Sequence, residues 1–220
     1  MDERAQGIVL RVHPLTETSL IIRWLTPQFG RLATAAKGAR RSKSPFRGKL
    51  DLFYVADFTF GRSRRSDLHT LRELRLQETH PGLRRDLAYL RQASYGAALI
   101  EQTTEMESPV PVIFQLMDGF LRQLCQHPAE PRTIFAFELK LLNELGLRPD
   151  LAKSRFSPGA KEIVNALIRS DWSDLFRLKL SSGQTTELRQ FLHGFLVFHL
   201  GKIPNSRVSA LSIAGHPAHL

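Results

Sequence analysis

The strongest strand signal in this chain is Phe53-Tyr54-Val55-Ala56-Asp57-Phe58-Thr59-Phe60. Aromatic and β-branched residues of this kind favour the extended backbone of a sheet. Segments of similar character precede it at residues 8–12 and 20–26, a weaker one lies at 32–36, and 69–76 follows with imperfect alternation. Five short strands within the first 80 residues predict a small closed β-barrel of the OB type.

After residue 80 the period of the apolar residues changes from two to about 3.6, which predicts helices. The clearest apolar stripe consists of Ile113, Leu116, Met117, Phe120, Leu121 and Leu124. Further helices are expected near residues 83–105, 134–145 and 159–170, and a last one is expected from a cap at Thr185 or Thr186 to His199. The chain is therefore expected to have an α+β fold, with an OB-fold domain at 1–80 and a helical domain at 81–220.

The charge of the chain is strongly positive, with a formal net charge of +10 and an isoelectric point near 10.3. Residues 1–80 hold 15 Lys and Arg against 8 Asp and Glu, whereas the remaining residues hold 16 against 13. Such an excess favours association with a polyanion, either nucleic acid or anionic lipid. The sequence has no basic amphipathic helix, which disfavours a role at a membrane surface.

Several kinds of chemistry lack their usual sequence signals. The single cysteine, Cys125, excludes a disulfide framework and a multi-cysteine zinc site. No Gly-Lys-Ser/Thr phosphate loop occurs, and His193 and His199 would lie about 120° apart on a helix, facing different ways. We therefore expect no catalytic residue, no metal and no cofactor, and thus a protein that is not an enzyme. With neither an amino-terminal signal nor a long apolar run, a cytoplasmic location is expected.

A basic stretch between the third and fourth expected strands suggests a binding site. It runs from residue 37 to residue 49 and contains no acidic residue. Its cations are Lys37, Arg40, Arg41, Lys43, Arg47 and Lys49. Charge runs of this kind also occur as solvated loops, but a one-signed loop on an oligonucleotide-binding fold favours phosphate contacts. If all six cations contact a single strand, log K should fall against log salt with a slope of about −4.

A second basic group lies in the next expected turn and comprises Arg62, Arg64 and Arg65. If the two turns converge on one rim of the barrel, all nine cations would face the same nucleic-acid strand. Within the first stretch, Phe46 could stack on a base or could anchor the loop to the barrel. Because the sequence contains no base-reading helix or zinc finger, sequence-specific recognition is disfavoured.

The segment from Lys37 to Phe53, written K-G-A-R-R-x-K-S-x-F-R-G-x-L-x-x-F, closely resembles the corresponding loop of the bacterial RecO family. The opening at residues 7–10 and 16–20 and the segment 29–32 are similar to that family as well. Residues 137–146, followed by Pro149-Asp150-Leu151, resemble its helix and the turn after it. The resemblance therefore spans both expected domains.

The resemblance to RecO implies a DNA-binding mediator of recombinational repair, associated with the nucleoid. Such a protein would bind single- and double-stranded DNA, anneal complementary strands, engage single-stranded DNA-binding protein and RecR, and indirectly help to load RecA at gaps. It would place phosphate-binding roles on the cations of residues 37–49. Many members carry a four-cysteine zinc module after the Pro-Asp-Leu turn. Here residues 152–159 contain no cysteine, so a short loop is expected instead.

Two alternatives remain open from the sequence. An RNA- or ribosome-associated OB protein would show the same basic loop and the same salt dependence. An enzyme with an unrecognised active site would show turnover without added partner proteins. In the helical domain, Arg122 and Arg132 are candidates for binding the acidic tail of a protein partner.

Overall fold

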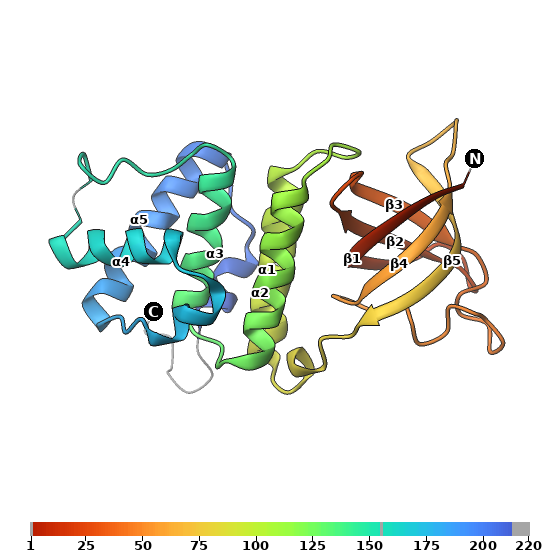
Figure 1. Ribbon diagram of the computed structural model, residues 1–220, viewed down its shortest axis with the longest axis horizontal. Helices are drawn as coiled ribbons and strands as arrows, with labels where there is room; N and C mark the ends of the chain where they lie inside the picture. The colour runs from red at the N-terminus through yellow and green to blue at the C-terminus, as the bar shows by residue number, and fades with distance from the viewer. Residues whose placement is uncertain (1, 155, 213–220) are drawn as a thin grey trace. The chain divides into compact units, whose positions relative to one another are not determined.

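The computed structural model describes residues 2–154 and 156–212 of the 220-residue chain (Figure 1). The amino-terminal part contains five strands: β1 (Asp2–Pro14), β2 (Leu20–Thr26), β3 (Gly30–Ala36), β4 (Val55–Gly61) and β5 (Leu68–Glu78). They close into a barrel in the order β1-β2-β3-β5-β4. β3 and β5 pair in parallel, and the other neighbouring pairs are antiparallel. The predicted OB-type barrel is confirmed.

Large aromatic side chains fill the barrel interior. The rings of Trp24 and Phe58 stack with their centroids 4.3 Å apart, and Trp24 Nε1 donates a buried hydrogen bond of 2.9 Å to Thr34 Oγ1. Gly7 lies against this stack, where a Cβ would come within 2.9 Å of the Phe58 ring. A glycine on β1 therefore leaves the space that the two aromatic rings occupy.

Phe53 was expected to be the first residue of the strand at residues 53–60, but it lies outside that strand. It adopts a left-handed φ of 65°, and β4 starts at Val55. The Phe53 N–H donates to the Val9 carbonyl at 2.8 Å, and the Phe53 carbonyl is bonded to His80 Nδ1 at 2.8 Å. Its side chain is buried. The aromatic signal at this position reflects burial at a bend rather than an extended backbone.

After β5, the described chain forms helices joined by loops. It contains α1 (Leu87–Thr103), α2 (Pro111–Gln126), α3 (Pro131–Glu144), α4 (Pro158–Arg169), α5 (Ser182–Leu200) and α6 (Ser206–Leu211), with short 3₁₀ helices at Pro81–Arg84 and Trp172–Arg177. The cap expected at Thr185 or Thr186 is wrong. Ser181 caps α5 instead, because its Oγ accepts from the Gln184 N–H while Gln184 Oε1 accepts from the Ser181 N–H.

A buried ion pair ties α6 to the helical core. Arg207 Nε and Nη2 donate to the two oxygens of Glu138 at 2.7 and 3.0 Å. The Tyr95 hydroxyl donates to the same carboxylate, whose residue is fully buried. Burial is the main cause that raises the pKa of Tyr95 well above its ordinary value, and the Glu138 charge adds to the increase. All the polar atoms of this carboxylate therefore have charged or hydrogen-bonding partners, as burial requires.

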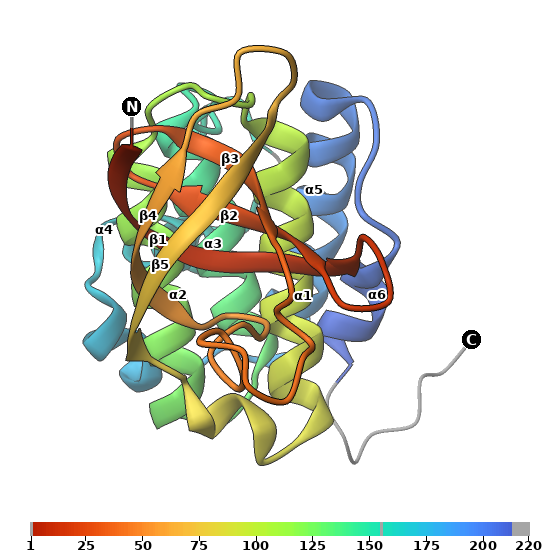
Figure 2. The same ribbon diagram turned by 90° about the vertical axis from the view of Figure 1, so that its right-hand side faces the viewer.

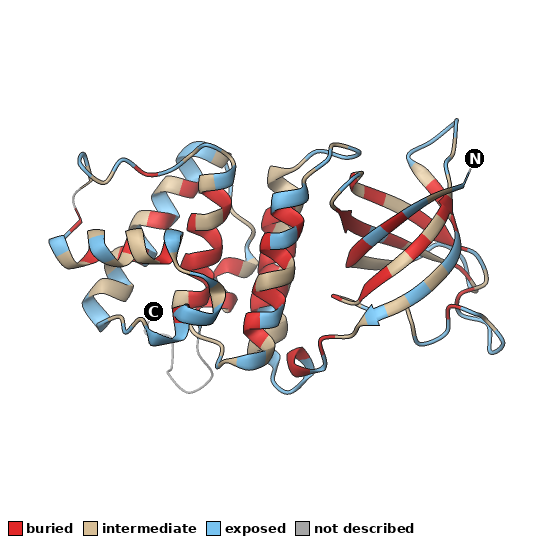
Figure 3. Cartoon of the chain, in the orientation of Figure 1, coloured by how far each residue is buried: buried red, intermediate tan, exposed pale blue. Residues whose placement is uncertain are grey.

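The chain divides into two compact units. The barrel unit comprises residues 1–80 and 101–118, and the helical unit comprises residues 81–100 and the residues from 119 onward. In both, buried residues line the inner faces of the strands and helices (Figure 3). The expected domain boundary near residue 80 stays a prediction. Among the helices that the structure describes, none is long and apolar enough to cross a membrane.

Candidate nucleic-acid interface

The basic loop, residues 37–49, follows β3 and folds into a series of tight turns. Backbone hydrogen bonds run from Arg41 to Gly38 at 3.0 Å, from Ser44 to Arg41 at 3.1 Å and from Arg47 to Ser44 at 3.2 Å. Gly38 adopts a φ of 67°, a left-handed conformation that suits glycine because it lacks a Cβ. The loop is therefore a compact structure rather than an extended, solvated strand.

Two apolar side chains anchor the basic loop to the barrel. Phe46 and Ala39 are only 7% and 6% exposed and belong to the same core cluster as Trp24 and Phe58. Of the two roles considered for Phe46, the structure shows the anchor. A ring buried in this cluster offers no face on which a base could stack.

The turn between β1 and β2 braces the basic loop from one side. The Arg40 N–H donates to the Thr18 carbonyl at 2.9 Å, and the Gly38 N–H donates to Ser19 Oγ at 3.2 Å. The turn itself is closed by Thr16 Oγ1, which accepts from the Ser19 N–H at 3.1 Å. The backbone that carries the cations is therefore held by apolar contacts to the barrel core and by hydrogen bonds to the β1–β2 turn.

The side chains of the basic loop keep their charges available. Lys37, Arg40, Arg41, Lys43 and Arg47 are exposed, and Lys49 is half-buried. Across residues 2–154 and 156–212, none of these cations forms an ion pair with a carboxylate. Arg47 Nη1 donates to the Ser42 carbonyl at 3.1 Å, which leaves its charge uncompensated. Phosphate is a strong acceptor for such donors.

The second basic group lies at the opposite end of the barrel. Pairing of Pro14 with Leu20 and of Leu20 with Ala36 gathers one end, here called the loop end, from which the basic loop projects. Pairing of Asp2 with Gly61, next to the β4–β5 turn at residues 62–67, gathers the other, here called the hairpin end. Both views show the two segments at opposite ends (Figures 1 and 2). The two turns do not converge on one rim, so the condition under which all nine cations would face one strand is not met.

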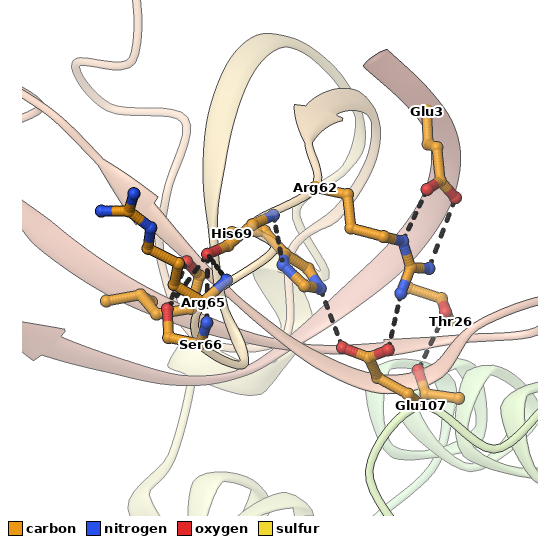
Figure 4. Close-up of polar contacts among 10 residues, drawn as sticks. Glu3, Thr26, Arg62, Arg65, Ser66, His69 and Glu107 are labelled. Atoms are coloured by element: carbon orange, nitrogen blue, oxygen red, sulfur yellow. Dashed lines mark hydrogen bonds and ion pairs between the residues drawn. The ribbon is translucent and has the colours of Figure 1, made fainter. Parts of the chain in front are cut away.

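Carboxylates neutralise Arg62 at the hairpin end (Figure 4). Its Nε lies 2.6 Å from Glu3 Oε1, and its Nη1 lies 2.6 Å from Glu107 Oε2. The hydrogen bond from Arg62 is the main cause that lowers the pKa of Glu3, and the same bond raises the pKa of Arg62. Glu107 Oε1 also contacts the buried His69 at Nε2, 2.9 Å away. Arg62 is therefore committed to an internal network.

The other two arginines of the β4–β5 turn are exposed. Arg64 and Arg65 lie on a turn that Ser63 closes, because Ser63 Oγ accepts from the Arg65 and Ser66 N–H groups at 3.3 and 3.2 Å. Segment 101–118, which belongs to the barrel unit, carries four acidic residues and no cation. One of these acids is the Glu107 that binds Arg62. With two exposed arginines, this turn offers fewer cations to phosphate than the basic loop does.

The structure does not bring Arg122 and Arg132 together in one cavity. Arg132 borders a cavity of about 350 Å³ with Pro131, Leu180 and Thr185, and Arg122 is not among the residues that line it. Arg132 Nε contacts Glu130 Oε2 at 2.8 Å, and its Nη1 donates to the Leu178 carbonyl. Its side chain is only 15% exposed. These contacts make Arg132 part of the cavity wall.

No arrangement for metal binding is present within the described ranges, where no group of three or more His, Cys, Asp or Glu could hold an ion.

The sequence alone did not reveal the residues that shape the basic loop. The bracing role of Thr18 and Ser19 depends on strand register. The pairing of Arg62 depends on partners 59 and 45 residues away along the chain. No local pattern signals either.

Comparison with known proteins gives two matches to family models. The model described as "Recombination protein O N terminal" matches residues 1–80, and the model described as "Recombination protein O C terminal" matches residues 84–156. The DNA repair protein RecO of Listeria monocytogenes serotype 4b (strain CLIP80459) is 28% identical over 213 residues, which cover 92% of this chain and 80% of that protein. The protein of the same name from Bacillus pumilus (strain SAFR-032) is 28% identical over 208 residues, covering 91% and 80%. That of Rhodopirellula baltica is 33% identical over 143 residues, covering 65% and 53%.

Proposed function

Because the chain belongs to the recombination protein O family, we propose that it acts in DNA repair by binding single-stranded DNA at its basic loop. The observation that carries this proposal is the state of the loop cations. The basic loop of this OB-type barrel carries six cations and no acidic residue. In the described part of the chain, these cations have no carboxylate partners. Contacts to phosphate would hold a strand without reading its sequence.

Strand annealing follows from the same chemistry. Two complementary strands repel each other through their phosphates, and cations that neutralise one strand lower the cost of bringing the second beside it. The reaction makes and breaks no covalent bond, so the proposed activity needs no catalytic residue and no cofactor. Double-stranded DNA, the product, offers the same phosphates to the loop.

The family relationship supports a set of partners. We infer that the protein engages single-stranded DNA-binding protein and RecR, and that it thereby helps to load RecA at gaps in damaged DNA. An acidic tail of a partner has one candidate site in the cavity beside Arg132. The positive side chain at its wall supports this choice, although Glu130 competes for it.

Strand annealing in the presence of single-stranded DNA-binding protein tests the role of the loop. A variant with Arg40→Ala, Arg41→Ala and Lys43→Ala should anneal roughly 100-fold more slowly, since three charge-assisted contacts to phosphate are lost. The matched control carries Arg64→Ala, Arg65→Ala and Arg75→Ala, which removes the same charge elsewhere on the barrel and should anneal much faster than the loop variant. Equal rates for both variants would refute the proposal.

Salt dependence and competition then identify the ligand. For the wild type, log K against log salt should have a slope of about −4, and the loop variant should have a slope of about −2. Matched DNA and RNA strands should be compared as competitors in the same assay. A clear preference for RNA would favour the RNA-associated alternative over DNA repair.

A further inference from the structure

A second set of cations lies on the outer face of β1 and β2, beside the basic loop. Strand register places Arg11 directly opposite Arg23. The next row, Val12 opposite Ile22, faces the barrel core, where Ile22 is fully buried. Because side chains alternate between the two faces of a strand, Arg11 and Arg23 face outward.

The outward row is continuous with the loop end of the barrel. The Arg40 N–H is bonded to the Thr18 carbonyl in the β1–β2 turn, at 2.9 Å. The outward row nearest that turn pairs His13 with Ile21, and the row after the next pairs Arg11 with Arg23. Arg23 lies three residue steps along β2 from Leu20 at the rim, a distance of about 10 Å. A single-stranded DNA held by the basic loop could therefore continue over the β1–β2 turn onto the outer face of β1 and β2.

The placement of these arginines is electrostatically unfavourable in the protein alone. Like charges directly opposite one another on paired strands destabilise a sheet. A third arginine, Arg31 on β3, lies near them: burial lowers its pKa, Glu101 opposes the decrease, and Arg23 adds to it. Arg23 is exposed and has no carboxylate partner within residues 2–154 and 156–212. A polyanion would relieve this repulsion.

Glu101 compensates for only one of the two outward arginines. Both Nε and Nη2 of Arg11 lie 2.9 Å from Glu101 Oε2, and Arg11 is still 40% exposed. A carboxylate and a phosphate offer a guanidinium group the same kind of acceptor. Glu101 therefore occupies the position that a phosphate oxygen would take on Arg11.

We propose that Arg11 and Arg23 form a second phosphate subsite for single-stranded DNA, with Glu101 as its intramolecular competitor. The subsite rests on the proposed function of the basic loop, whose bound strand it extends along β2. A strand that reaches this face displaces the Glu101 carboxylate from Arg11 and gains the unpaired charge of Arg23. Glu101 thus determines how far the bound single-stranded DNA extends over the outer face of β1 and β2.

Fluorescence anisotropy with an oligothymidylate probe tests the competitor. Glu101→Gln should bind the probe about twofold to fivefold more tightly, as removal of a surface ion-pair partner allows. Its slope of log K against log salt should steepen by about 0.7, which corresponds to one further counterion released from single strands. The matched control is Glu73→Gln on β5, which makes the same charge change at an exposed position. Equal gains in the two variants would overturn the proposal.

The arginines are tested by removing each in turn. Arg23→Ala should weaken binding more than Arg75→Ala, which removes an exposed arginine from β5. In a variant that combines Arg11→Ala with Glu101→Gln, the gain seen for Glu101→Gln alone should disappear. Arg23→Ala and Arg75→Ala with the same affinity would sink the subsite. The loop variant would still bind poorly in that case, so the proposed function would stand apart from this failure.

Discussion

At the loop end of the barrel, the cations have no carboxylate partners in the described structure, and the loop is held by Phe46 in the core and by backbone bonds to the β1–β2 turn. At the hairpin end, the Arg62 guanidinium is itself the anchor, held between Glu3 and Glu107. Both segments are short, basic and rich in serine. One end uses apolar contacts to present charge, and the other uses charge to build structure.

The difference shows why a basic run is an ambiguous signal. Whether an arginine is available for a ligand depends on acids that the fold brings to it, here from β1 and from the segment after α1. Counting charges along the chain cannot find them, because the partners are separated by 59 and 45 residues. The compensating acid must be sought in space before a cation is assigned to a site.

The largest expected effect comes from the glycines of the two ends. Gly30 at the hairpin end has a φ of 62°, and a Cβ there would lie 1.8 Å from the Ser108 carbonyl oxygen. Gly30→Ala should therefore lower the free energy of unfolding by about 4 kcal/mol, through backbone strain and overpacking together. Gly48 in the basic loop has a similar φ of 72° but no atom within 4 Å of its Cβ position. Gly48→Ala should cost about 1 kcal/mol.

Urea unfolding of the two variants measures this contrast. Equal losses would mean that segment 101–118 is not closely packed on the hairpin end, and the comparison between the ends would fail. A larger loss for Gly30→Ala would show that this end is built for close backbone approach.

The sequence predicted the barrel well because its strands carry their own signals. Residues 20–26 form β2 as expected, since alternation and β-branched residues act locally. It failed at Phe53 and at the start of α5, where a tertiary hydrogen bond and a competing cap decide the outcome. The α6 helix was not expected at all, because its stability depends on the buried Arg207–Glu138 pair.

The candidate site was predictable in part. The composition of residues 37–49 predicts a basic loop, and its position between β3 and β4 follows from the order of the strands. Arg11 and Arg23 gave no such signal, because they lie 12 residues apart and meet only through the register of β1 with β2. Register is fixed by packing and turn geometry across the whole sheet, which a single sequence does not display.

The next effect concerns the apolar anchor of the loop end. Phe46→Ala should lower the free energy of unfolding by about 3 kcal/mol, because a ring that is 93% buried leaves a cavity in the barrel cluster. The affinity for single-stranded DNA should fall as well, although no cation is removed. Urea unfolding at low and at high salt measures the first effect, and the loss should be the same at both. A loss that shrinks with added salt would mean that the anchor is ionic after all.

The smallest effect is the response of the hairpin end to acid. Arg62 holds the pKa of Glu3 below its ordinary value of 4.5. The pair therefore contributes stability above the unfolded-state pKa, and that contribution is lost as pH falls through the lower, folded-state pKa. Since both side chains are solvent-accessible, it should amount to less than about 1 kcal/mol. Glu3→Gln should consequently lose less stability than the wild type between about pH 7 and about pH 3, measured by urea unfolding. Glu73→Gln, which removes an exposed carboxylate without a described ion-pair partner, should lose as much as the wild type. If the two variants lose the same stability over this pH range, the ion pair does not stabilise the hairpin end. The contrast between an ion-paired hairpin end and an apolar loop end would then be refuted.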